Sequence, residues 1–434
     1  MNRIKDFLNS DGGRLARYRQ RRSRRVDIEI DDVEPQSKNM PGPDRDRFQS
    51  AVAKQLKEIK RSTFRGDVAL KLDLATTSKN APQAHTIAKN LLDLLGQLRQ
   101  GVDWPMRHLL YNDDRQIQAL SVSCRHGEKR PKIRIEARAF AAMLDDLEFA
   151  AERVRVAEMN HEAYYDKERE GEWIDTFRDL VRNKERERKT LGDSMFDAYF
   201  KMVRWSAQRA LLSRSGVDIP VLSLMYGLPK GRPTVFDIPT GFDKGMWAQL
   251  IGESKLRLQI GELPITTGGS AAFKQRVAAE IAKFKKHWDW IISPLVVAVA
   301  LEVIVRPNPK TPPAVLHDLD NVVRDYLLPG IVPSFGTVSD HRWTIDFDEL
   351  RKRDPKLAES WGPNPTPPPG TKSGITRYEA WRLPSVDGEP GFVSVALVAD
   401  MDAQGDRMDQ IDKIFRKWRD EMVDHRRYSW HRRR

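Results

Sequence analysis

The chain carries one order of elements twice, and this repeat constrains its fold more than any other feature. Each copy has an alternating apolar run, a loop rich in Pro or Gly, an apolar helical pattern and a second strand. These elements occupy 26–30, 35–43, 48–59 and 68–74, and again 256–260, 264–269, 273–284 and 299–305. A shift of roughly 225 to 235 positions relates the two sets, so the sequence predicts a tandem duplication of one α+β unit with a mixed or antiparallel sheet.

Two further alternating runs end each copy. They lie at 117–123 and 132–137 in the first copy and at 377–386 and 392–398 in the second. Each pair flanks a Gly-Glu dipeptide, and this spacing predicts a closing β-hairpin in both copies.

The boundaries follow from these patterns and from shifts in composition. Between the copies the sequence is charged and helical, and the second copy is interrupted by a Pro-rich segment that we expect to be a flexible surface insertion. We expect a basic N-terminal arm (1–25), a first copy (26–140), a helical insertion and linker (141–253), a second copy (254–425, with the Pro-rich insertion at 351–373) and a basic tail (426–434).

Length and charge bound the function. A chain of 434 residues is too long for one ordinary core. Lys and Arg number 74 against 62 Asp and Glu, a net charge of +12 that indicates an anionic partner, with nucleic acid first and a membrane surface second. No apolar run reaches the roughly 18 residues of a membrane span, so we expect a soluble, cytoplasmic protein. Cys124 is the only cysteine, which excludes an intrachain disulfide and a cysteine zinc site.

Arginines gather at both ends of the chain. The first 25 residues form either a solvated arm or a phosphate-binding arm. The tail interleaves arginines with Tyr428 and Trp430, which suits phosphate contact combined with base stacking, although a frayed, solvated tail fits equally well. The candidate DNA-binding residues are Arg14, Arg17, Arg21, Arg22, Arg24, Arg25, Arg342, Arg426, Arg427, Arg432 and Arg433.

An acidic pattern lies in the second copy. Asp318 and Asp320 follow a long apolar run and precede a helical pattern, so both carboxylates can converge on one divalent cation. Asp340 supplies a third carboxylate later in the chain, and Arg324 lies about one helical turn beyond Asp320, where it could face a phosphate. An Asp/Asn cluster before a helix is also what a plain helix N-cap looks like.

The same positions in the first copy carry different residues. When the copies are aligned, Gln83, His85 and Lys89 correspond to Asp318, Asp320 and Arg324, and Asp113-Asp114-Arg115 corresponds to Asp340-His341-Arg342. The first copy therefore lacks two of its three acids, and we expect it to bind no catalytic metal.

With these residues identified, the chain resembles the RusA-like Holliday junction resolvases. The family signature has an Asp-x-Asp-Asn-x-x-Lys helix start and a later Asp-Asp-x-Gln strand start. The second copy is similar to the former in Asp318, Asp320 and Asn321, and the first copy to the latter in Asp113 to Gln116, together with Lys89. The departures are Gln83, His85 and Thr86 in the first copy, and Arg324, Leu328 and His341 in the second.

The resemblance implies a structure-specific, Mg²⁺-dependent endodeoxyribonuclease of DNA recombination and repair, with Mn²⁺ as an alternative ion. Carried over, it makes Asp318, Asp320 and Asp340 the metal ligands and Arg324 the phosphate-stabilising cation. Gln83, His85, Lys89, Asp113 and Asp114 would form a degenerate first-copy site.

The substrate implied is a Holliday junction or other branched DNA, cut by one competent site per chain. A homodimer, or a partner protein bound through the helical insertion, stays open. The competing hypothesis is a non-catalytic protein that binds branched or single-stranded DNA through two decayed sites.

Overall fold

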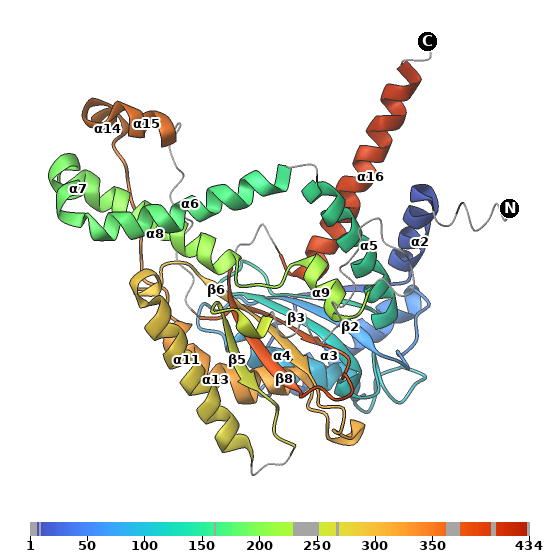
Figure 1. The fold of residues 1–434 in the computed structure, drawn as a ribbon. Helices are drawn as coiled ribbons and strands as arrows, with labels where there is room; N and C mark the ends of the chain where they lie inside the picture. Colours follow the sequence, from blue (N-terminus) through green and yellow to red (C-terminus); the bar gives the residue numbers. More distant parts are fainter. Residues whose placement is uncertain are drawn as a thin grey trace.

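One mixed β-sheet forms the centre of the protein, and helices cover both of its faces (Figure 1). This computed structural model describes residues 7, 10–159, 162–228, 251–265, 269–361, 374–400 and 405–431. The fold class is α+β, as the sequence predicts. Within the described part of the chain, every helix is too short or too polar to cross a membrane.

The eight strands run in the order β1-β4-β2-β3-β7-β6-β8-β5. The first half of the chain supplies β1 (Val26–Asp31), β2 (Val68–Ala75), β3 (Ile117–Arg125) and β4 (Lys132–Ala139). The second half supplies β5 (Arg257–Gly261), β6 (Val299–Arg306), β7 (Arg377–Arg382) and β8 (Phe392–Ala399). In both halves the first strand pairs antiparallel with the fourth, the second antiparallel with the fourth, and the second parallel with the third.

The two halves meet through β3 and β7, which pair antiparallel at the middle of the sheet. Leu120 lies opposite Ala380, and Val122 lies opposite Tyr378. Val122 and Ala380 occupy equivalent positions in the two halves. A half turn about an axis between Ser121 and Glu379 therefore exchanges the two halves and maps one of these residue pairs onto the other. The start of β3 therefore lies beside the end of β7.

The predicted closing hairpins are wrong. β2 lies between β3 and β4, and β6 lies between β7 and β8. The connection after β3 instead passes over the end of β2, where Thr76 N donates to Arg125 O at 2.8 Å and Glu128 N donates to Thr76 O at 2.9 Å. A short loop spans two strand spacings of about 4.8 Å each as easily as it makes a tight turn, so loop length alone did not distinguish the two arrangements.

Four helices cover one face of the sheet. They are α3 (Gly42–Glu58), α4 (Ala84–Gly96), α11 (Ser270–Ile292) and α13 (Leu328–Phe335). In α3, Phe48, Val52 and Leu56 recur at helical spacing and are fully buried against the strands, as the periodicity predicts. This face holds the larger apolar core.

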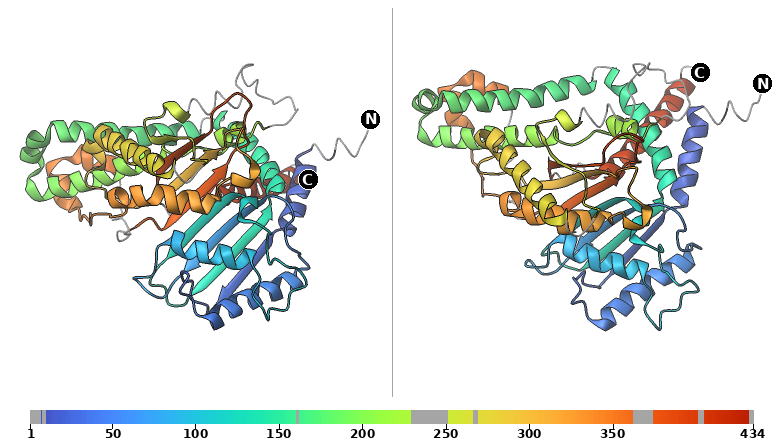
Figure 2. Two further views of the ribbon diagram at one scale, coloured as in Figure 1. Left: turned by 90° about the horizontal axis from the view of Figure 1, so that it is seen from below. Right: turned by 60° about the horizontal axis from the view of Figure 1, so that its bottom comes forward.

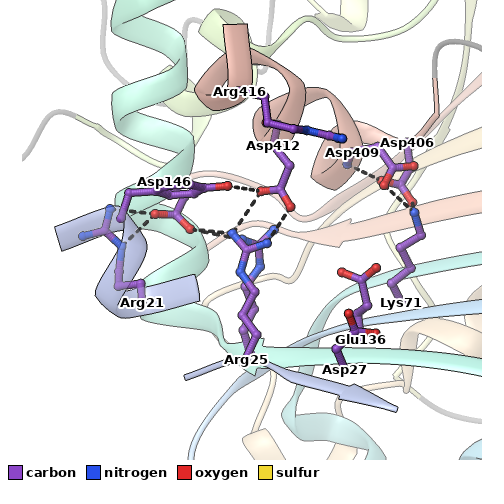
Figure 3. A network of polar contacts seen from close by, with 12 residues as sticks. Arg21, Arg25, Asp27, Lys71, Glu136, Asp146, Asp406, Asp409, Asp412 and Arg416 are labelled. Carbon is purple, nitrogen blue, oxygen red and sulfur yellow. Dashed lines mark hydrogen bonds and ion pairs between the residues drawn. The ribbon is translucent and has the colours of Figure 1, made fainter. Parts of the chain in front are cut away.

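The opposite face is covered by helices from both ends and from the middle of the chain. They are α2 (Asp11–Ser23), α5 (Phe140–Met159), α9 (Ile219–Met225) and α16 (Arg407–His431). The C-terminal helix α16 packs on strands of the first half: Lys71 Nζ on β2 lies 2.6 Å from Asp409 Oδ1 and 3.3 Å from Asp406 Oδ2 (Figure 3). The two halves are thus joined by charge pairs as well as by the sheet.

The helical insertion projects away from the sheet as an arm (Figures 1 and 2). It comprises α6 (Glu162–Arg182), α7 (Lys184–Leu191) and α8 (Asp193–Ser213), joined by α14 (Phe347–Arg353) and α15 (Pro355–Trp361). The helical prediction for this region is confirmed where the structure describes it. Residues 229–250 of the predicted linker and 362–373 of the Pro-rich insertion lie outside the described residues.

Candidate metal centre

Two carboxylates of the candidate site come from the second half. Asp318 is the N-cap residue of α12 (Leu319–Asn321), and Asp320 lies within this short helix. The helix continues into a π-helical segment, η4 (Val322–Leu327), a conformation that is rare overall and frequent at functional sites. Because α12 packs against β3, β7 and α4, both acids lie at the junction of the two halves.

The third carboxylate comes from the first half. Asp114 begins the short helix η1 (Asp114–Gln116), directly before β3, and Asp113 caps that helix by accepting a hydrogen bond from Arg115 N. One carboxylate oxygen from each of Asp114, Asp318 and Asp320 lies within 4.8 Å of the others. Three negative groups at this separation repel one another unless a cation is near.

Burial makes the repulsion stronger. Asp320 is only 2% exposed, and its buried Oδ2 atom has no hydrogen-bond partner apart from the ion pair with Lys89 Nζ at 3.4 Å. Burial, followed by the charges of Asp114 and Asp318, raises the pKa of Asp320 to about 6 against the attraction of Lys89. Burial and Asp114 also raise the pKa of Asp318. A set of hard oxygen donors that includes a buried oxygen held only by an ion pair fits a divalent cation such as Mg²⁺.

Lys89 on α4 is the cation nearest to the three acids. Its Nζ atom lies 3.0 Å from Asp114 Oδ2, 3.4 Å from Asp320 Oδ2 and 3.1 Å from Asp93 Oδ1. Burial is the largest single influence and favours the neutral amine, but Asp320, Asp114 and Asp93 together outweigh it and raise the pKa of Lys89. The ammonium is therefore charged and within reach of any phosphate bound at the acids.

Asn321 and Arg324 support the cluster from one side. Asn321 Nδ2 donates to Asp318 Oδ2 at 2.8 Å, and Arg324 Nη2 donates to Asn321 Oδ1 at 2.8 Å. Arg324 also forms an ion pair with Asp325 at 2.7 Å. This chain of hydrogen bonds fixes the rotamer of Asp318, so Arg324 orients a ligand through Asn321 and is not the cation closest to the acids.

Asp340, the third ligand expected from the sequence, does not join Asp318 and Asp320. Its carboxylate is exposed and pairs with Arg342 Nε at 3.2 Å. The neighbouring His341 is held on α8, because its Nε2 atom lies 3.0 Å from Lys201 O. Asp114, which the sequence placed in a degenerate first-copy site, is the third member of the cluster. Its intact Asp-Asp-x-Gln motif was the signal for this role, but no local pattern showed which half it would meet.

The remaining first-copy residues lie outside the acid cluster. Gln83 is the N-cap residue of α4 and makes no capping hydrogen bond through its side chain. Burial and the charge of Arg324 lower the pKa of His85. Asp113 pairs with Arg115 at 2.5 Å, and this pairing lowers its pKa to about 2. Asp113 therefore has a structural role in capping η1.

Most arginines of the predicted basic N-terminal arm that are candidates for DNA binding are paired within the fold. Residues 11–23 form α2, which packs on α5 and α16. Arg25 bridges Asp146 at 3.1 Å and Asp412 at 2.5 Å, and Arg21 also binds Asp146 (Figure 3). The sequence run looked solvated because its acidic partners lie more than a hundred residues away.

The other predicted arginines divide into three groups. Arg14 binds Glu152 at 2.7 Å, and Arg17 lines a cleft with Arg14 and Arg21. Arg22 and Arg24 are exposed, as is Arg342. The side chains of Arg426, Arg427, Arg432 and Arg433 lie outside the described residues.

Comparisons of the chain with protein-family models, with curated proteins and with solved structures found no match.

Proposed function

We propose that this protein is a divalent-metal-dependent endonuclease acting on branched DNA, with one composite site per chain. The observation that carries the proposal is the convergence of Asp114, Asp318 and Asp320 within 4.8 Å beside Lys89. Mg²⁺ or Mn²⁺ bound there would supply an activated water and offset the charge of a phosphodiester. The three acids hold the ion, and Lys89 stabilises the negative charge that develops on the phosphate oxygens.

We further infer that the chain is a tandem duplication of a RusA-like unit, an internal pseudo-dimer. The support is the matching strand order and pairing in the two halves and the half-turn relation about Ser121 and Glu379. The site would then use the strand-start acid and the lysine of one copy with the helix-start acids of the other. This division accounts for the family motif being split between the two copies.

A single composite site means that each chain cuts one strand. The position related to it by the half turn has Gln83 and His85 for the helix-start acids and Arg324 for the lysine. Neutral side chains cannot offset the dehydration of Mg²⁺, so this position is expected to contact DNA without cutting it. Two cuts in one junction would then require two chains.

One observation favours the second candidate, a non-catalytic protein that binds branched DNA. Lys89 already pairs with two of the three acids, so the cluster holds a cation of its own. In that case binding to a junction would depend steeply on salt, and no divalent ion would produce cleavage.

Cleavage of a four-way junction tests the two candidates. Each of its four strands is labelled in turn and incubated with the wild-type chain, with Asp114→Asn or with Asp320→Asn, with and without Mg²⁺. We expect the wild type to nick in Mg²⁺ and both variants to bind the junction without nicking it.

Asp340→Asn is the matched control, because Asp340 is an exposed acid outside the cluster. It should cleave like the wild type. Loss of cleavage in Asp340→Asn with full activity in Asp114→Asn would refute the composite site, and absence of cleavage by the wild type with Mg²⁺ or Mn²⁺ would refute the nuclease.

A further inference from the structure

A buried arginine joins the two segments that carry the acids. Arg382 ends β7 and is 5% exposed. Its Nη1 atom donates to the backbone carbonyl of Arg115 at 3.1 Å, and its Nη2 atom donates to the backbone carbonyl of His317. Arg115 directly follows Asp114, and His317 directly precedes Asp318. One guanidinium therefore spans the first-half and second-half parts of the acid cluster.

This arrangement ties together two acids that lie on short elements. Asp114 belongs to a three-residue helix and Asp318 to the N-cap of another three-residue helix, so neither acid is held by a long element. Because the guanidinium is planar and donates to both carbonyls, moving one carbonyl away from the other breaks one of the two hydrogen bonds. Arg382 thus links the backbone beside Asp114 to the backbone beside Asp318, in addition to the packing of α12 on β3 and β7.

A second, more exposed tie supports the same join. Arg115 Nη1 donates to Ala314 O at 2.8 Å, across the same boundary between the halves. The side chain of Arg115 is 39% exposed, so water competes for this hydrogen bond. Arg382 is shielded from such competition by its burial.

The arginine is present in one half only. In the second half Arg382 pairs with Val305 of β6, and in the first half the matching place opposite Leu74 of β2 is held by Cys124. A thiol cannot donate to two carbonyls. The bridge therefore accompanies the acid cluster and has no counterpart at the position related to it by the half turn.

We propose that Arg382 is a positioning residue for metal binding: it sets the gap between Asp114 and the pair Asp318 and Asp320 by holding the carbonyls beside them. This inference rests on the proposed metal site. It goes further by assigning the assembly of the site to a residue that touches none of the oxygens expected to bind the ion.

Calorimetric titration with Mn²⁺ tests the assignment without using activity. Arg382→Met should weaken Mn²⁺ binding by about 10- to 100-fold, and Arg382→Lys, which can reach only one carbonyl, should fall between it and the wild type. Arg306→Met is the matched control. Arg306 is equally buried at the end of β6 and donates to the Pro390 carbonyl at 3.1 Å, in a loop that carries none of the three acids.

The control separates positioning from a general loss of stability. If Arg306→Met lowers the melting temperature as much as Arg382→Met yet binds Mn²⁺ within about twofold of the wild type, the assignment is supported. Equal Mn²⁺ affinity in the wild type and in Arg382→Lys or Arg382→Met overturns it, and the lysine variant decides the matter if the methionine variant does not fold. A wild-type chain that binds no Mn²⁺ overturns the metal site itself, a result distinct from unchanged affinity in the variants.

Discussion

Replacing Asp320 by Asn should stabilise the protein in the absence of metal, even though it removes a partner of Lys89. The carboxylate is 2% exposed, has an oxygen without a hydrogen bond and lies beside two other acids. These conditions raise its pKa from 3.8 to about 6, a value that already includes the opposing attraction of Lys89. Ionised Asp320 is therefore a net cost to the folded state, as expected of a residue kept for binding and not for stability.

The magnitude follows from the shift. Each pKa unit corresponds to ~1.4 kcal/mol, so the ionised carboxylate lowers the free energy of unfolding by roughly 3 kcal/mol at pH 8. Because the folded-state pKa lies above the unfolded-state value, this cost falls to about 1 kcal/mol near pH 4.5 and vanishes at lower pH. For a chain of 434 residues, 3 kcal/mol corresponds to a rise in melting temperature of roughly 3 °C.

Thermal unfolding of the wild type and of Asp320→Asn, at pH 8 and pH 4.5 with a chelator, measures this difference. The variant should melt higher at pH 8, and its advantage should shrink at pH 4.5. Adding Mg²⁺ at about 100 times its dissociation constant should return roughly 2.7 kcal/mol to the wild type and little to the variant. A variant that melts below the wild type at pH 8 without metal would show that the pair with Lys89 outweighs burial and repulsion, and would refute this reasoning.

Three further outcomes are expected. Lys89→Met should slow cleavage by about 10² to 10³-fold, measured in single turnovers, while calorimetry still detects Mn²⁺ binding, because the ammonium acts on the phosphate and not on the ion. Asn321→Ala should weaken Mn²⁺ binding by about tenfold, since Asp318 loses the donor that fixes its rotamer; unchanged affinity would assign that rotamer to packing. Arg25→Met should lower the free energy of unfolding in urea by about 3 kcal/mol, because it removes a cation shared by two largely buried carboxylates; a loss below about 0.5 kcal/mol would place this network among ordinary surface pairs.

The sequence by itself determined the repeated strands and helices, because apolar periodicity reports directly which face of an element is buried. It also identified Asp318 and Asp320, since a pair of acids between a buried strand and a helix start is a local pattern. Lys89 and Asp114 were recognised as parts of a motif for the same reason. The local pattern did not show which part of the motif in one copy lies beside which part in the other copy.

Only the tertiary structure decided how the fragments combine. Pairing of β3 with β7 brings the start of β3 against the end of β7, and so places Asp114 beside Asp318. Asp340 is kept away because the neighbouring His341 is held near α8. Insertion of β2 between β3 and β4 is likewise a choice among strand neighbours that alternation does not encode. The alternation of apolar and polar residues and the local charge are properties of a single segment. Strand order and the contact between the two halves instead depend on the apolar surface that the whole sheet buries.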